Sequence, residues 1–455
     1  MKKEIMETDV AVIGGGPGGI ASAVAAARQG ARTLIVEQTG YLGGNMATGL
    51  PLLAFLDAQG RQVTGGIAQQ FVDKLTEMGG CYGHRPCSLH NSTTVINANY
   101  AKIISFQMIK DHNITPVLHC QTVAANVENG KLTSVTVMGK GTQIEIRAKV
   151  FIDATGDGDV AFLAGARYEK GQAATGELQP PSLLFDLGGV NLEPFFDYLD
   201  AHPEDMQLGP TMKIRPGYNP AHLRGSPNHV FVGLRGLMTR LRAEGKCPVD
   251  RDTVIYINQP IKNHVTINTI RILNFDGTDI SDLSKGEMTA HLQILPLIRM
   301  LQEYVPGFEN SYLSSINPFI GVRETRRIIG KKMVREADAV NGFVPDDSIG
   351  LGSYIIDIHS GTGDSTIITS LPNPYGIPYG CTVAANIGGL MMSGRCASVD
   401  AVVFGSSRVM PTCMAIGEGA GVGAALAAKY GIEPADVNTD EIRTILRENG
   451  AILSL

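Results

Sequence analysis

The sequence predicts an α/β protein in which the first and last segments form one domain, interrupted by an inserted α+β domain. A glycine-rich turn near residue 14 lies between a strand pattern and a helix pattern, and the middle of the chain mixes both patterns. Glycine makes up 54 of the 455 residues, well above a background of about 7%. Such an excess indicates many places with positive φ or close backbone approach.

The first element is a short apolar run at 8–13, which predicts a buried strand. The next residues, 14–19, fit the pattern GxGxxG, and a helix pattern follows over 17–29. A second strand pattern, 33–36, ends at Glu37, about 20 residues after the glycines, where an acid can bind a ribose hydroxyl. In this Rossmann-like context the fingerprint predicts a dinucleotide with its pyrophosphate at the helix N-terminus.

The chain after Glu37 differs from a nicotinamide-binding domain. A glycine-containing loop at 41–49 stands where an early third strand would begin. Helix patterns follow at 67–78 and 97–110, and a β-meander pattern covers 116–146. This order of elements argues against an NAD-binding dehydrogenase.

These features resemble the glutathione-reductase-type FAD superfamily. The resemblance is carried by the fingerprint with Glu37, the Leu42-Gly43-Gly44 loop, the meander and the segment 152–159. More narrowly, the chain is similar to the bacterial FAD-dependent oxidoreductase family at 323–327, 376–379, 393–396 and 407–413. The resemblance implies FAD as the cofactor. Some relatives attach the flavin covalently through a histidine near this glycine loop. No histidine precedes Gly83 in this sequence, so a non-covalent FAD is expected.

The resemblance also implies which residues contact the FAD. It assigns the pyrophosphate, the ribose, the adenine and the flavin, with its ribityl chain, to matching positions of this sequence. These positions are Gly14, Gly16, Pro17, Gly18, Gly19, Glu37, Gly43, Gly44, Asn45, Val123, Ala154, Gly156, Asp157, Gly394, Arg395, Met410 and Thr412.

The segment 412–430 predicts a helix that contains four glycines, each costing about 1 kcal/mol relative to alanine. Two features could offset this cost. One is close packing against another helix or the sheet. The other is a flavin at the helix N-terminus, where amides near 410–413 would stabilise negative charge.

The family resemblance and the patterns together divide the chain into four parts. The FAD-binding domain is expected at 1–165 and 380–433, an inserted substrate domain at 166–379, and a docking helix at 434–455. Within the insert, strand patterns occur at 182–187, 253–257 and 264–272, and helix patterns at 230–244 and 285–304. No second GxGxxG occurs in a strand–turn–helix context, so a separate NADPH domain is not expected.

Composition excludes several classes of protein. The formal net charge is −6 and no basic tract occurs, which argues against nucleic acid as a partner. The longest apolar runs fall short of the ~20 residues of a membrane helix. The seven cysteines form no CxxC pair, so neither a disulfide framework nor a metal site is expected. A cytoplasmic location and a homo-oligomer fit these observations.

Three residues are candidates for the chemistry. Arg323 lies three positions before Arg326, on one face if the segment is helical, and could bind a carboxylate or form structural salt bridges. His359 could donate a proton or act as a base. Tyr379 could donate a proton or stack its ring beside the flavin. Each could instead be structural. Cys413, near a helix N-terminus, could be a redox-active thiol.

The resemblance implies an FAD-dependent oxidoreductase that transfers a hydride between flavin N5 and a small organic substrate. A carboxylate-bearing substrate, with C=C reduction or CH–CH dehydrogenation, agrees with the arginines. One alternative is a CH–OH dehydrogenase acting on a polyol or a hydroxy acid. The other is a non-catalytic FAD-fold protein that escorts a partner. The sequence names no electron donor or acceptor.

Overall fold

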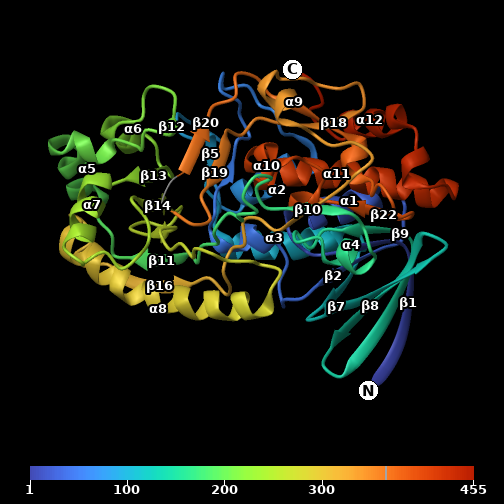
Figure 1. Ribbon diagram of the computed structural model, residues 1–455. Coiled ribbons are helices and arrows are strands. Elements are labelled where there is room, and N and C mark those ends of the chain that lie inside the picture. Colours follow the sequence, from blue (N-terminus) through green and yellow to red (C-terminus); the bar gives the residue numbers. More distant parts are fainter. Residues whose placement is uncertain (364–365) are drawn as a thin grey trace.

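The computed structural model describes residues 1–363 and 366–455. Its largest sheet has the strand order β6-β2-β1-β9-β8-β7, with β22 added beside β9. The strands are β1 (Lys2–Ile13), β2 (Thr33–Glu37), β6 (Thr115–Leu118), β7 (Gln121–Glu128), β8 (Lys131–Gly139), β9 (Thr142–Asp153) and β22 (Leu390–Met392). β22 pairs in parallel with β9, so segments far apart in the sequence share one sheet (Figure 1).

Two helices, α1 (Pro17–Arg28) and α11 (Met410–Tyr430), pack against this sheet, and α2 (Gly66–Glu77) and α3 (Ala98–Asp111) pack against these helices and each other. α1 and α11 are in close contact. A Cβ at Gly417 would lie 2.3 Å from the carbonyl oxygen of Gly18, and one at Gly421 would lie 2.2 Å from that of Ser22. Close packing thus offsets the glycine cost of α11, which confirms the first of the two explanations.

The inserted part is built on a five-stranded sheet in the order β13-β14-β15-β11-β16. Its strands are β11 (Phe185–Gly188), β13 (Val230–Gly233), β14 (Val254–Asn258), β15 (Val265–Ile267) and β16 (Tyr312–Ile316), and its helices are α5 (Leu192–Ala201), α6 (Pro220–Gly225), α7 (Arg235–Ala243) and α8 (Ile280–Tyr304). The helix predicted over 230–244 was wrong at its start. The apolar residues 230–233 pair with β14, and Leu234, at φ 61°, precedes α7.

The core of the insert ends earlier than the predicted boundary at 379. Its buried apolar residues lie between Leu183 and Ile320. Most buried apolar residues from Val334 to Tyr379 belong instead to the core around α1 and α11. The reason is the hairpin of β18 (Ser348–Gly352) and β21 (Tyr375–Pro378), since Ile349 packs against Gly419 of α11.

Short elements complete the fold. The strands are β3 (Leu52–Leu53), β4 (Arg85–Cys87), β5 (Asn91–Thr94), β10 (Tyr168–Lys170), β12 (Met212–Lys213), β17 (Arg326–Ile328), β19 (Ile356–His359) and β20 (Thr366–Thr369); the helices are α4 (Asp159–Leu163), α9 (Glu336–Val340), α10 (Ala401–Ser407) and α12 (Thr439–Glu448). α12 buries Ile442 and Leu446, in line with a docking helix. In the described chain no single helix is long and apolar enough to cross a membrane; α10 and α11 together pass that test but are bent by 97°.

Candidate active site

The glycine fingerprint forms an open cradle at the start of α1. Gly14 has φ 110°, and a Cβ on Gly19 would lie 1.9 Å from the carbonyl oxygen of Gly14. These two glycines therefore allow the turn and the close strand–helix contact. A Cβ on Gly16, by contrast, would meet no atom within 4 Å. The space beside Gly16 and the first helical amides is open, as a bound pyrophosphate requires.

Glu37 lies at the carboxyl end of β2 beside this cradle. Its carboxylate accepts hydrogen bonds from the amides of Gly15 (2.9 Å) and Thr39 (2.8 Å). The amide of Cys120 donates to the carbonyl of Glu37 at 3.2 Å, which brings the start of β7 to the same edge. Val123, on β7, is 44% exposed. The position of Glu37 suits a ribose.

The loop after β2 folds back onto the fingerprint. The amide of Gly43 donates to the carbonyl of Gly15 at 2.8 Å. Gly43 and Gly44 have φ values of 113° and 49°, and a Cβ on Gly44 would lie 3.0 Å from Cα of Gly16. Asn45, the next residue, lines a cavity. Two glycine motifs from separate parts of the sequence therefore meet.

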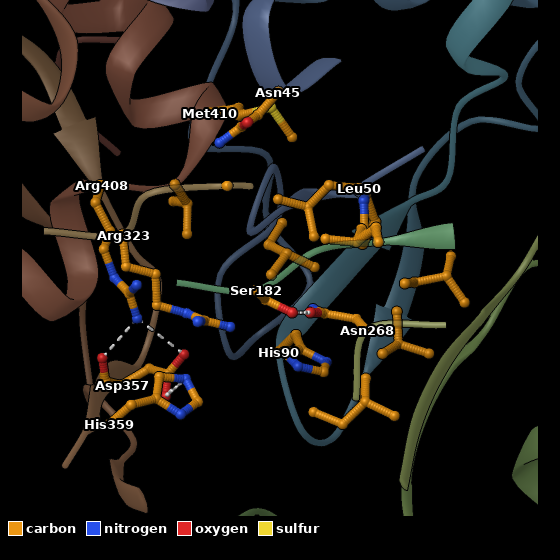
Figure 2. Close-up of a pocket in the computed structure, with 18 of the residues that line it drawn as sticks. Asn45, Leu50, His90, Ser182, Asn268, Arg323, Asp357, His359, Arg408 and Met410 are labelled. Carbon is orange, nitrogen blue, oxygen red and sulfur yellow. Dashed lines mark hydrogen bonds and ion pairs between the residues drawn. The ribbon is translucent and has the colours of Figure 1, made fainter. Parts of the chain in front are cut away.

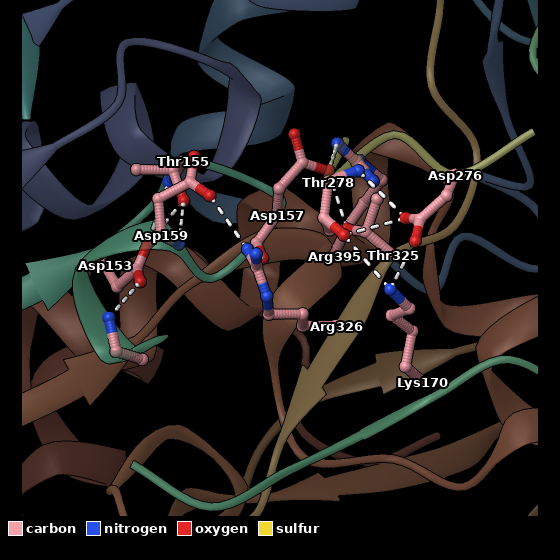
Figure 3. A network of polar contacts seen from close by, with 11 residues as sticks. Asp153, Thr155, Asp157, Asp159, Lys170, Asp276, Thr278, Thr325, Arg326 and Arg395 are labelled. Carbon is pink, nitrogen blue, oxygen red and sulfur yellow. Dashed lines mark hydrogen bonds and ion pairs between the residues drawn. The ribbon is translucent and has the colours of Figure 1, made fainter. Parts of the chain in front are cut away.

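A polar network fixes the loop that follows β9 and begins at Ala154 (Figure 3). The buried carboxylate of Asp153 accepts hydrogen bonds from the amide and hydroxyl of Thr155, at 3.0 and 2.7 Å. The carboxylate of Asp157 accepts from Thr325 at 2.7 Å and pairs with Arg395 at 2.9 Å. Arg395 is thereby fixed next to Gly156, which has φ 82°, and its charge is neutralised.

The prediction that Arg323 and Arg326 lie on one face of a helix was wrong. Arg326 belongs to β17, which pairs with β10, and its guanidinium bonds the carboxylate of Asp159 at 2.9 Å. It also stacks on the ring of Phe162. Arg323 lies in the connection before β17 and lines the cavity. Strand pairing, rather than the three-residue spacing, separates the two side chains.

The N-terminus of α11 meets the same region. Val409 and Met410 line the cavity, and the amide of Cys413 is already bonded to the carbonyl of Val409 at 3.0 Å. Pro411 has no amide hydrogen, so the amides of Met410 and Thr412 are the first-turn donors. Burial raises the pKa of the Cys413 thiol to about 12. Burial therefore disfavours the thiolate that a redox-active Cys413 would need, and it outweighs the effect of the helix terminus.

A cavity of about 170 Å³ extends from the residues at the start of α11 into the insert (Figure 2). Asn45, Arg395 and Met410 border one end. Apolar side chains form much of the remaining wall, and they come from both domains: Leu53, Leu89, Leu184, Val230, Val232, Ile255, Ile257 and Ile368. The cavity therefore joins the predicted flavin-contacting residues to an apolar chamber.

One side of the cavity is charged, and we call Arg323, Arg408, Asp357 and His359 the cationic wall. Arg408, at the end of α10, pairs with the carboxylate of Asp357 at 3.3 Å. The Nε2 atom of His359 lies 3.2 Å from the Asp357 carboxylate. Arg323 donates to the carbonyl of Pro180. In Figure 2 these four side chains lie on one side of the cavity, opposite Asn268 and His90.

The cationic wall shifts the pKa of each group in it. Burial alone would raise the pKa of Asp357, but His359, Arg408 and Arg323 hold it well below its usual range. Burial lowers the pKa of His359 to about 3, against the opposing effect of Asp357. Burial, with Arg408 and Arg251 nearby, lowers the pKa of Arg323 to about 9. Near neutral pH the wall therefore carries a carboxylate, a neutral histidine and two guanidinium ions.

The two other predicted chemical residues differ in placement. His359 lines the cavity, but its Nδ1 atom is within 3.1 Å of the Thr366 hydroxyl, so both ring nitrogens have protein neighbours. Tyr379 is not among the residues that line the cavity. Its hydroxyl donates to the carbonyl of Pro434 at 2.9 Å, and its ring packs against Gly423 of α11. The structure gives Tyr379 a packing role.

Several cavity residues were not predicted as site residues, namely His90, Arg251, Asn268 and Arg408. Arg408 lies inside a motif that was singled out, beside Met410, and could have been noted there. Asn268 lies inside the strand pattern at 264–272 and Arg251 just before the one at 253–257, and neither strand pattern indicates a site. Among the described residues no group of three or more His, Cys, Asp and Glu side chains could hold a metal ion.

The chain is similar in part or in fold to several known proteins. A 72-residue segment is 36% identical to the sarcosine oxidase subunit alpha of Corynebacterium sp. (strain U-96), covering 16% of this chain and only 6% of that subunit. Two solved structures are similar over almost the whole chain. One is a geranylgeranyl bacteriochlorophyll reductase-like protein from Thermoplasma acidophilum (14% identity, TM-score 0.49, 98% of this chain and 84% of that one). The other is p-nitrophenol 4-monooxygenase from Pseudomonas putida (10% identity, TM-score 0.43, 99% and 82%).

The family comparison is broader and covers both ends of the chain. The model of the FAD dependent oxidoreductase family matches residues 9–446, which include the glycine cradle, the cationic wall and the start of α11. FAD is therefore the cofactor that the cradle is built to hold. The chain belongs to the FAD dependent oxidoreductase family.

Proposed function

We propose that this FAD-dependent oxidoreductase transfers a hydride between FAD and a small carboxylate-bearing substrate, by C=C reduction or CH–CH dehydrogenation. The observation that carries the proposal is Arg323. Its guanidinium lines the cavity, and no ion pair joins it to a carboxylate of the described chain. A guanidinium held in a protein interior is favoured by an anionic partner, and it binds carboxylates through two parallel hydrogen bonds.

Bound FAD supplies the hydride chemistry, and the residues of the chain bind and orient the substrate. Asn45 and Met410 border the cavity at the end where we place the flavin. Arg323 holds the carboxylate, and the apolar wall holds the rest of the substrate and excludes water. Arg408 stays paired with Asp357 and keeps that carboxylate from competing for Arg323.

C=C reduction adds a proton as well as the hydride, and CH–CH and CH–OH dehydrogenation each remove one, so every one of these reactions needs a group that transfers a proton. With a pKa lowered by burial to about 3, His359 is a weak base near neutral pH. Its contacts with Asp357 and Thr366 support a positioning role. We therefore assign His359 to holding Asp357 in place.

The test is to photoreduce the FAD-loaded enzyme anaerobically and mix it with a panel of α,β-unsaturated acids and their primary amides. The return of the oxidised flavin band measures hydride transfer. We expect acids to reoxidise the flavin at least about ten times faster than amides, and Arg323→Met to remove this preference. Arg147→Gln, at an exposed ion pair with Glu145, is the matched control. Equal rates for acids and amides in the unchanged enzyme would refute the proposal.

A further inference from the structure

A second guanidinium in the cavity, that of Arg251, comes from the inserted domain. Arg251 precedes β14, is 3% exposed and lines the cavity. Its Nη1 atom donates to the carbonyl of Asn268 at 3.4 Å, and its buried Nε atom has no hydrogen-bond partner within the described part of the chain. The carboxylate of the neighbouring Asp252 forms its ion pair with Arg235, at 3.0 Å, and it acts on Arg251 only through its charge, as Asp357 does.

Arg251 and Arg323 both line the cavity, and the charge of Arg251 contributes to the lowered pKa of Arg323. Asn268, the residue that Arg251 contacts, lies across from Arg323, Arg408 and Asp357 (Figure 2). The side chain of Asn268 accepts a hydrogen bond from Ser182 at 2.7 Å, which fixes that wall. Beside the apolar chamber, the cavity therefore holds two guanidinium groups, those of Arg251 and Arg323, that form no ion pair with a described carboxylate.

The charges of the cavity do not balance within the described residues. Arg408 is paired with Asp357, and Arg395 is paired with Asp157. No ion pair to a described carboxylate includes Arg251 or Arg323. Burial lowers the pKa of Arg251 to about 10, with the nearby Arg271 adding to the effect. Holding a charge away from water without a counter-ion is costly, so such a site is stabilised when a ligand supplies the opposite charge.

We propose that Arg251 is a second anion subsite, so that the cavity takes substrates with a doubly negative head group and an apolar body. One negative charge lies at Arg323 and the other at Arg251. This inference rests on the proposed function, which assigns the first carboxylate to Arg323. Two carboxylates on neighbouring carbons, or a single phosphate, share the required chemistry.

The test is a titration of the oxidised, FAD-loaded enzyme, followed through the change in its visible flavin spectrum. Benzylsuccinate carries two carboxylates, 4-phenylbutyrate is the same molecule without one of them, and 3-phenylpropyl phosphate carries a phosphate instead. We expect a dianion to bind at least about tenfold more tightly than 4-phenylbutyrate. Arg251→Met should reduce dianion affinity to the level of the monoanion and leave the monoanion unchanged. Arg251→Lys should restore part of the preference, and Arg147→Gln should change nothing.

The outcomes separate the two proposals. A preference for benzylsuccinate over the phosphate assigns the two charges to two carboxylates, and the reverse assigns them to one phosphate. If all three ligands bind equally in the unchanged enzyme, the second subsite is refuted while the carboxylate proposal stands. The same holds if Arg251→Met weakens all ligands equally. If none of the ligands perturbs the flavin, both proposals fail. The comparison within the unchanged enzyme decides the matter even if Arg251→Met does not fold.

Discussion

The glycine cradle and the arginine-containing cavity satisfy their polar groups in opposite ways. In the cradle, Glu37 bonds two backbone amides, and the loops at Gly15 and Gly43 bond each other. In the cavity, Arg251 and Arg323 form no direct ion pair with a carboxylate of the described chain, and the Nε atom of Arg251 has no hydrogen-bond partner there. The difference teaches that the shape of the cradle is set by the chain itself, whereas we propose that a bound anion balances the charge of the cavity.

The largest effect should come from the helix contact that supports the cradle. A Cβ on Gly421 would lie 2.2 Å from the carbonyl oxygen of Ser22 and 2.8 Å from Cβ of Ala25. Gly421→Val should lower the free energy of unfolding by roughly 3 kcal/mol or more, measured by urea denaturation. Gly225→Ala, where a Cβ meets open space, should stay within about 0.5 kcal/mol. A stable Gly421→Val protein would contradict the close α1–α11 packing.

A buried carboxyl group in α11 is an exception to this difference, because it lies outside the cavity and is nevertheless incompletely hydrogen-bonded. Glu418 is 2% exposed, accepts a hydrogen bond from the amide of Ile67, and leaves its other oxygen without a partner. Burial raises its pKa from 4.5 to about 7, although Ile67 and Arg28 act in the opposite direction. The folded state therefore binds the proton more tightly than the unfolded state, and stability falls as the pH rises between these values.

The pH effect can be isolated with Glu418→Gln, which keeps the shape but does not ionise. The unchanged protein should lose up to about 3 kcal/mol relative to this variant between about pH 5 and about pH 8. Urea denaturation of both proteins at the two pH values measures the difference. A difference that is independent of pH would show that Glu418 is ionised in the same way in both states.

The role of the cradle can be tested at Gly16, where an added side chain would enter the space expected for the pyrophosphate rather than contact protein atoms. Gly16→Val should fold normally, because a Cβ there has no neighbour within 4 Å. It should weaken FAD binding about 100-fold, which corresponds to about 2.7 kcal/mol. Fluorescence titration of the FAD-free protein gives the affinity, with Gly225→Ala as the control. Unchanged affinity would place the pyrophosphate elsewhere.

The smallest effect concerns the ligand-free cavity. Arg251→Met removes a buried charge that has no counter-ion among the described residues, so its free energy of unfolding should rise by about 1 kcal/mol without ligand. Thermal unfolding of the FAD-loaded proteins measures this change, and Arg147→Gln should show none. A marked loss of stability would mean that Arg251 serves the fold, since a ligand-binding charge is costly when the ligand is absent.

The parts of the structure that could be predicted from the sequence are those whose residues lie close together along the chain. The strand, glycines, helix and Glu37 lie within 40 residues and fix the cradle through local geometry. The start of α11 was found in the same way. Arg251 and Asn268 reach the cavity only because β14 and β15 pair in the insert, and no local pattern shows that. Arg326 and Tyr379 were misinterpreted because strand pairing and helix packing decide where they point.

The most direct test of the account is a crystal structure of the FAD-loaded enzyme with benzylsuccinate. We expect the flavin at the end of the cavity bordered by Asn45 and Met410, with one carboxylate on Arg323 and the other on Arg251. A flavin outside this cavity, or a ligand whose carboxylates contact neither arginine, would contradict it.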